Sequence, residues 1–419
     1  MVTDMKRESN FFGSHNARLI GLHPGSAMIM LVTLHYLIPS ALPLATSFRA
    51  LLLVLLMLAN FHIYLSGLQS KPEIQLFTVY SLVMFMLVLW SLAYDAVRVI
   101  PADLNEIIKP YLSCMFFGCA AVWGADRKYQ DAFGRMLSLL VLFSLILFLT
   151  GQLGGASGNS IRTLFVPDRT ILSNKLVGVF GTTYFACGVL TLTALWYGSA
   201  WVMGVNRWFS AVMFLLCVVL AVMTQSRSGF VALTVSLSLM VIIVPIVVPA
   251  KALRWLFAVT LTSVLVVIAA TQIELDGLIS LSYLESGIRG YVINYSENVS
   301  HGSLGARLSQ LSWALSENEL IVIGSGIGKG YQRYLESLYA LQYYRYGLAG
   351  LYLYFGLIIF VAALSLKTLL RWRKYEGSDC SIKRLRMVSM AGLLVCLSLP
   401  ISSFASAITD QIHMIPIYY

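Results

Sequence analysis

Long apolar stretches constrain this chain more than any other feature. A helix that crosses the roughly 30 Å hydrocarbon core of a bilayer needs about 20 mostly apolar residues. Such stretches recur along the sequence, and only 11 % of its 419 residues are charged, against about 25 % in soluble domains. A soluble core of this size would interleave apolar and polar faces. The pattern therefore predicts an all-α, polytopic transmembrane helical bundle.

The chain is interpreted as one membrane domain, 1–419, with a large extramembrane loop at 271–347 and a second loop at 152–181. A polar N-terminal segment indicates that no signal peptide is cleaved. Residues 411–419 leave room for the start of a twelfth span. The eleven predicted spans are 26–44, 50–68, 74–94, 108–124, 136–151, 182–198, 208–225, 229–248, 252–270, 348–366 and 387–408.

The distribution of Lys and Arg predicts the orientation, because cytoplasmic loops carry an excess of both. With a cytoplasmic N-terminus, the inner segments hold 17 cations and the outer segments 12. Seven of the inner cations lie in 367–386. The two long loops are then extracytoplasmic. Topology also accounts for the net charge of +10, so no nucleic-acid partner is implied.

Several outer cations run against this bias. Five lie in 271–347, and three, Arg162, Arg169 and Lys175, lie in 152–181. Phosphate oxygens are the natural partners of such groups. These cations therefore predict that the outer face binds an anionic group.

A short polar link, residues 224–229, separates two apolar stretches and contains Arg227. An arginine at bilayer depth costs about 2.5–3.5 kcal/mol on insertion scales. Two interpretations remain open, a turn arginine that extends to the interface and an anion site at a helix junction.

The second half of the large loop contains a predicted helix, with Ser303 as its N-cap and Arg307 on the face opposite the leucines. A glycine-rich run at 324–330 predicts close backbone approach and positive φ angles. It does not match a nucleotide-binding P-loop, because glycine follows Lys329. The leucines at helical spacing are Leu304, Leu308, Leu311 and Leu315.

Glu336, Tyr339, Tyr343 and Arg345 lead into the span at 348–366. The tyrosines fit an interfacial aromatic belt or a platform for sugar rings. The six cysteines are interpreted as free thiols. Without a His, Asp or Glu cluster at ligand spacing, we expect neither a catalytic metal nor a cofactor.

Four short patterns in fixed order resemble the superfamily of O-antigen ligases and Wzy-type O-antigen polymerases, over about residues 170–365. They are Val177-Gly178-Val179-Phe180-Gly181 with Tyr184-Phe185-Ala186, then Ser226-Arg227-Ser228-Gly229, then Gly305-Ala306-Arg307 through Trp313 and Glu317-Asn318 to Gly324-Ser325-Gly326, and finally Tyr346-Gly347-Leu348-Ala349-Gly350.

The resemblance implies a metal-independent glycosyltransferase of the C-type helical fold in a bacterial inner membrane. Its substrate would be an undecaprenyl-pyrophosphate-linked oligosaccharide, and its partners membrane lipids, a chain-length-regulating co-polymerase and a flippase. Arg227 and Arg307 would stabilise the pyrophosphate leaving group, and Glu336 would act as the base. Supporting substrate contacts would come from Arg169, Lys175, Arg345, Tyr339 and Tyr343.

One departure favours polymerase over ligase. The ligases carry a histidine shortly before the following span, whereas this chain has Glu336 there and no histidine in 331–347. The expected product is O-antigen or a related surface polysaccharide. The open alternatives are an O-antigen ligase, a flippase for lipid-linked oligosaccharides, and a peptidoglycan polymerase of the shape-elongation-division type.

Overall fold

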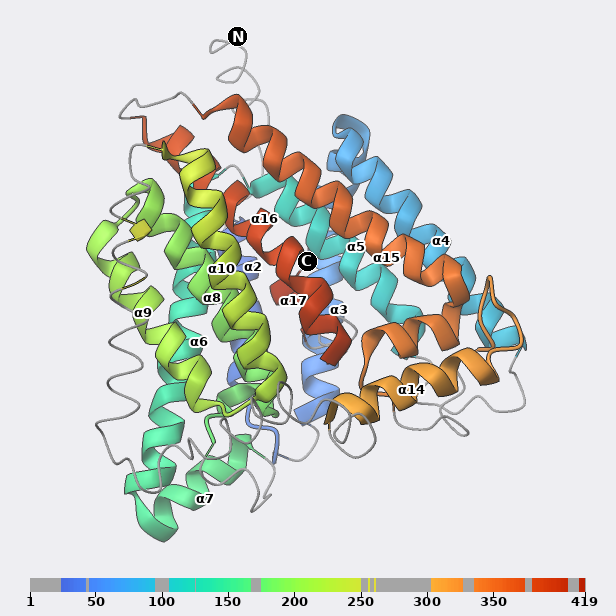
Figure 1. Ribbon diagram of the computed structural model, residues 1–419, viewed down its shortest axis with the longest axis horizontal. Coiled ribbons are helices and arrows are strands. Elements are labelled where there is room, and N and C mark those ends of the chain that lie inside the picture. The colour runs from blue at the N-terminus through green and yellow to red at the C-terminus, as the bar shows by residue number, and fades with distance from the viewer. Residues whose placement is uncertain are drawn as a thin grey trace.

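The computed structural model describes residues 24–42, 45–94, 105–124, 126–166, 175–249, 255–256, 260, 303–326, 335–373, 379–405 and 414–418. These ranges contain helices and no β-strand, which confirms the all-α prediction for them (Figure 1). The helices are α2 (Pro24–Leu37), α3 (Ala45–Ser70), α4 (Pro72–Tyr94), α5 (Asn105–Trp123), α6 (Arg127–Leu153), α7 (Gly155–Phe165), the 3₁₀ turn η4 (Gly178–Phe180), α8 (Thr183–Met203), α9 (Arg207–Met223), α10 (Arg227–Val247), α14 (Ser303–Glu317), α15 (Leu338–Arg371), α16 (Cys380–Ala405) and α17 (Ile415–Tyr418).

Six of the described helices are long and apolar enough to cross a membrane, namely α4, α6, α8, α10, α15 and α16. This supports the predicted membrane bundle. The apolar parts of α2 and α9 are shorter. The predicted span at 252–270 lies outside the described residues except for positions 255, 256 and 260. A total of eleven spans therefore stays a prediction.

Helix α8 is the centre of the bundle. It packs against α9, α10 and α16, and 83% of its most apolar window is buried, compared with 28% for α4. Thr182 caps its start by accepting a hydrogen bond from the backbone N–H of Phe185 at 3.3 Å. Gly204 ends it in the left-handed conformation, φ 78°, as glycine does at many helix ends.

The sharp turn predicted between two apolar stretches is confirmed. Helices α9 and α10 are joined by residues 224–226 alone. Gln225 adopts a left-handed conformation, φ 52°. Ser226 caps α10, and its Oγ accepts from the backbone N–H of Gly229 at 3.2 Å.

Helix α15 runs from the end of the bundle where α14 lies to the end where α15 and α16 are joined (Figure 1). We call these the α14 end and the basic end. Residues 303–326 and the cation-rich segment 367–386 therefore lie at opposite ends. This arrangement agrees with the predicted alternation of sides and leaves open which end faces the cytoplasm.

The cation-rich segment is less of a loop than predicted, since α15 continues to Arg371 and α16 begins at Cys380. Two of its cations are buried in helix packing. Arg384 Nη1 lies 2.6 Å from Asp131 Oδ1 on α6. Arg386 Nη2 donates to the carbonyl oxygen of Val247 at 3.0 Å. These two arginines therefore also join α16 to α6 and α10.

The predicted start of a twelfth span is a short buried helix in the part of this segment that the structure describes. The four residues of α17 lie in the middle of the bundle, near α5 (Figure 1). Ile415 is 1% exposed. Helix α17 therefore fills interior space between longer helices.

Candidate functional site

The predicted site residues fall into two groups at the α14 end of the bundle (Figure 1). One group surrounds the turn between α9 and α10 and contains Lys175 and the backbone of Arg227. The other, around α14 and the start of α15, contains the remaining predicted residues that the structure describes. Arg169 and the side chain of Arg227 lie outside the described part of the chain.

Arg307 and Glu336 form an ion pair. Arg307 comes from the second turn of α14, and Glu336 stands two residues before α15. The two side chains are 17% and 30% exposed. A substrate can therefore reach a guanidinium and a carboxylate that already touch each other.

Gln310 fixes the position of Glu336 and was missed by sequence reasoning. Its Oε1 accepts from the backbone N–H groups of Glu336 at 3.0 Å and Ser337 at 3.2 Å. Gln310 follows Arg307 by three residues, so both side chains lie on one face of α14. The three-residue spacing of Arg307 and Gln310 was the feature of the sequence that could have identified Gln310. One face of α14 therefore binds both the side chain of Glu336 and the backbone at the start of α15.

The predicted apolar face of α14 is only partly correct, since Leu311 packs against the buried cluster at the start of α15 but Leu315 does not. Leu315, assigned to the apolar stripe, is 55% exposed, whereas Gln310 and Ala314 are buried. Arg307 shares the buried face. Helical spacing located the helix correctly. The start of α15 packs against the face that carries Arg307 and Gln310, because these side chains bind Glu336 and the backbone N–H groups there.

The turn that follows α14 is held by two buried side chains, Asn318 and Ser325. Asn318 Nδ2 donates to the carbonyl of Tyr343 at 2.9 Å, and its Oδ1 accepts from Ser325 Oγ at 2.7 Å. The Ser325 N–H donates to the carbonyl of Tyr344 at 2.8 Å. These bonds attach the turn to the first part of α15.

Two glycines let the turn and α15 cross at backbone distance. Gly324 has φ 82° and Gly347 has φ 62°, a region that suits glycine. A Cβ at Gly347 would overlap the backbone of Val322, and one at Gly324 would overlap the backbone of Arg345. The expected positive φ angles are confirmed at Gly324 and at Gly326, φ 112°. Residues 327–330 lie outside the described part.

Arg345 belongs to a different charge cluster. Its Nη1 lies 3.2 Å from Glu106 Oε2, and Lys109 Nζ lies 2.7 Å from the same oxygen. Glu106 is 1% exposed and Arg345 is 5% exposed. Glu106 and Lys109, from the start of α5, were not predicted. This cluster borders a cavity of about 60 Å³ that is also lined by Gln342.

The two predicted tyrosines lie in different surroundings. Tyr343 is 5% exposed, and its carbonyl accepts from Asn318. Tyr339 is half-buried, and its hydroxyl donates to the carbonyl of Pro400 on α16. Tyr339, three residues after Glu336, is the more exposed of the two.

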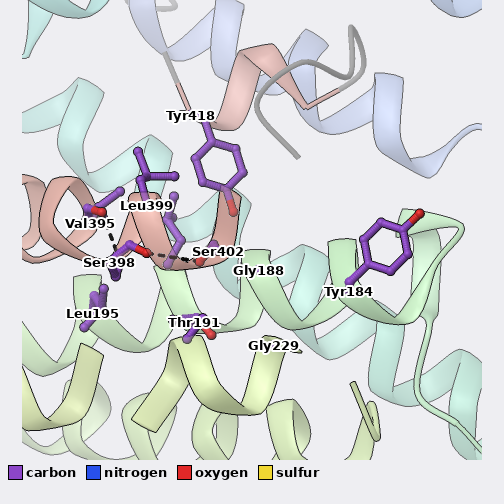
Figure 2. Close-up of a pocket in the computed structure, with 12 residues that line it drawn as sticks. Tyr184, Gly188, Thr191, Leu195, Gly229, Val395, Ser398, Leu399, Ser402 and Tyr418 are labelled. Carbon is purple, nitrogen blue, oxygen red and sulfur yellow. Dashed lines mark hydrogen bonds between the residues drawn. The ribbon is translucent and has the colours of Figure 1, made fainter. Parts of the chain in front are cut away.

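Lys175 lies beside the α9–α10 turn, because the N–H of the next residue, Leu176, donates to the carbonyl of Met223 at 3.1 Å. A small pocket of about 30 Å³ lies among α8, α10 and α16 near this turn. Figure 2 shows Gly229 of α10, Tyr184 of α8 and Ser402 of α16 around it.

Helix α16 connects the two groups. Pro400 accepts the hydrogen bond from Tyr339, and Ser402 lines the pocket that contains Gly229. Both the α14 group and the turn group therefore adjoin the same two turns of α16.

The described residues contain no group of three His, Cys, Asp or Glu side chains that could hold a metal ion. No family model and no curated protein matches the chain.

Proposed function

We propose that this chain is a membrane glycosyltransferase that polymerises undecaprenyl-pyrophosphate-linked oligosaccharide repeats into O-antigen or a related surface polysaccharide. The α14 end would face the outside of the cytoplasm, and the reaction would need no metal. The observation that carries the proposal is the partly exposed ion pair between Arg307 and Glu336 at this end of a membrane bundle.

The pair supplies the two functions that glycosyl transfer from a pyrophosphate requires. A cation must stabilise the charge that develops on the leaving pyrophosphate, and a base must receive the proton of the acceptor hydroxyl. Arg307 suits the first role because its planar fork matches phosphate oxygens. Glu336 suits the second because Gln310 fixes its backbone.

In the proposed step, the arriving pyrophosphate draws the Arg307 guanidinium away from Glu336. The freed carboxylate then receives the proton of the acceptor hydroxyl. That oxygen bonds to the anomeric carbon of the donor sugar as the bond from this carbon to the pyrophosphate oxygen breaks. Undecaprenyl pyrophosphate leaves as the anion, paired with Arg307. The backbone at the start of α10 would place Arg227 as a second cation.

Substitution of Glu336 in proteoliposomes tests the chemistry. An amide cannot accept the proton, so Glu336→Gln should abolish chain extension, while Glu336→Asp should keep part of the rate. Glu317→Gln, an exposed carboxylate on the same helix as Arg307, is the matched control. Polymer of normal length from folded Glu336→Gln protein would remove Glu336 as the base.

The product in cells separates the proposed function from its alternatives. Deletion of the gene should leave a single repeat unit on the core lipopolysaccharide, if the polymer is O-antigen. Naked core, with polymer accumulating on the carrier lipid, would instead identify a ligase. Loss of lipid-linked units from the outer face would identify a flippase.

The orientation is testable with a native cysteine. Among the six, Cys380 is exposed and the other five are buried. A membrane-impermeant maleimide should therefore not label Cys380 of the wild type in intact spheroplasts, and should label it after lysis. Ala306→Cys in a Cys380→Ser background should be labelled in intact spheroplasts, because residue 306 is exposed on α14. The reverse pattern would invert the topology.

A further inference from the structure

A cavity of about 610 Å³ lies inside the bundle, away from the Arg307–Glu336 pair. On one side it is bordered by α5, which packs against α3 and α4. On the other it is bordered by α15 and α16, which pack against each other (Figure 1). Phe116 and Ala120 of α5 face this cavity, as do Val361 of α15 and Val395 of α16. The cavity is thus the seam between two groups of helices.

The lining of the cavity changes along its length. Most of the lining side chains are aliphatic or aromatic, whereas its charged and amide side chains are Lys71, Glu73 and Gln130. Lys71 links α3 to α4, Glu73 lies in the first turn of α4 and Gln130 in the first turn of α6, all at the basic end. Tyr94, at the other end of α4, bonds to Glu319 beside α14, which fixes the direction of α4. The lining is therefore polar at the basic end of the bundle and mostly apolar along the rest of the cavity.

The charged lining residues are Lys71 and Glu73, and further cations stand next to other lining residues at this polar end of the cavity. Thr368 lines it, and Lys367 and Arg371 stand on the same stretch of α15. Gly124 also lines it, and Arg127 and Lys128 follow at the start of α6. An amphiphile with a phosphate head would place the head among these cations and its chain among the hydrocarbon side chains.

The volume indicates which chain fits. Ligand pockets measure about 300–1,000 Å³. A methylene group occupies about the volume of a water molecule, roughly 30 Å³, so 610 Å³ accepts about one phospholipid acyl chain. An undecaprenyl chain is several times larger.

We propose that the seam cavity binds one acyl chain of a membrane phospholipid, whose phosphate head lies at the basic end. The bound chain completes the packing between α5 and the α15–α16 pair. The polar end of this site lies at the opposite end of α15 from the Arg307–Glu336 pair. Its apolar part extends to Val395, Leu399 and Tyr418, which also line the small pocket beside Gly229. Lipid binding here does not depend on the proposed glycosyl transfer.

Native mass spectrometry of the purified full-length chain, together with its thermal midpoint, tests this inference. Wild-type protein should retain phospholipid at about one per chain. After delipidation, phosphatidylglycerol should raise the midpoint, and undecaprenyl phosphate should raise it less. No retained lipid and no shift with either lipid would overturn the proposal. A larger shift with undecaprenyl phosphate would overturn the assignment to an acyl chain.

Two substitutions to phenylalanine locate the site. Ala120→Phe fills the cavity, so lipid retention should fall at least tenfold. Val79→Phe adds the same ring on the exposed face of α4, where residue 79 is 56% exposed, and should retain lipid like the wild type. Equal retention by both folded variants would contradict the location.

A crosslinking measurement keeps the test decisive if Ala120→Phe does not fold. A photoreactive residue at Val361, in the cavity, should crosslink to phosphatidylglycerol bearing a radiolabelled chain. Washing with detergent before irradiation should leave the crosslink at position 361 and abolish the crosslink from the same residue at position 79. Equal sensitivity of the two positions to washing would place the lipid at the general bilayer surface and refute the site.

Discussion

The two parts of α15, on either side of Gly347, are built in opposite ways. Residues 338–346 are buried, apart from the half-buried Tyr339, and are tied to the turn after α14 by hydrogen bonds. Residues 348–371 are apolar and expose large side chains such as Tyr352, at 73%, and Ile359, at 66%. The first part is specified by polar contacts and the second by hydropathy. Gly347 separates them, because its backbone leaves the helical region at φ 62° and ψ −156° and kinks α15 at this point.

The largest expected difference between the two parts comes from their glycines. Gly347→Ala places a Cβ against the backbone of Val322 at φ 62°, so we expect a loss of about 3 kcal/mol or more in unfolding free energy. A Cβ at Gly356, in the second part, would meet nothing within 4 Å. Gly356→Ala should therefore change stability by less than about 1 kcal/mol. Unfolding in mixed micelles measures both, and equal effects would mean that α15 is not divided at Gly347.

The next largest effect is on activity at the first part. Arg307→Ala should slow polymerisation in proteoliposomes by about ten- to hundredfold, because a charge-assisted contact contributes about 1.5–3 kcal/mol. Arg307→Lys should restore part of the rate, since the charge remains and the fork is lost. Arg373→Ala, at the exposed end beyond α15, is the control and should leave the rate unchanged. A normal rate from folded Arg307→Ala would exclude Arg307 from the site.

A smaller effect is expected at the turn that holds the first part. Asn318→Ala removes the donor to the Tyr343 carbonyl and the acceptor for Ser325. Leaving buried polar groups without partners costs about 1–3 kcal/mol, and the expected loss is about 2 kcal/mol. Ser312→Ala, at an exposed position of α14, should cost less than about 0.5 kcal/mol. If the two variants unfold at the same denaturant concentration, the turn does not support α15.

The smallest effects are expected at the basic end, where two arginines contact the same carboxylate. Arg384, 7% exposed, and Arg127, 72% exposed, both pair with Asp131. Arg384→Ala should cost about 1–2 kcal/mol because Asp131 is itself 29% exposed. Arg127→Ala should lower the unfolding free energy by less than about 0.5 kcal/mol. In 1 M salt, the unfolding free energies of this variant and the wild type should be equal. Equal costs would show that burial does not distinguish the two pairs.

Hydropathy predicted the long apolar helices. The helices found at 183–203, 227–247 and 338–371 contain or overlap predicted spans, because apolar length is a local property of the sequence. The turn at 224–226 was predicted for the same reason.

The contacts of the candidate site were less accessible to sequence reasoning. Glu106 and Arg345 pair across 239 sequence positions, and nothing local to either residue indicates the other. Leu315 was wrongly assigned to the buried face of α14, because contacts with the start of α15 determine which face is buried. The pairing of Arg307 with Glu336 joins two residues that the sequence had singled out separately, while Gln310 was found only from the structure.

The three-residue link between α9 and α10 has a consequence for biogenesis. Because only residues 224–226 separate the two helices, neither helix can stay in the translocation channel while the other is released into the lipid. We expect the two to enter the lipid together as a helical hairpin. On the proposed topology, this carries Arg227 across the hydrocarbon layer, at about 2.5–3.5 kcal/mol for an arginine at mid-bilayer. The combined apolar length of both helices supplies the opposing free energy, so a polar substitution in α9 would show itself as failed insertion of α10.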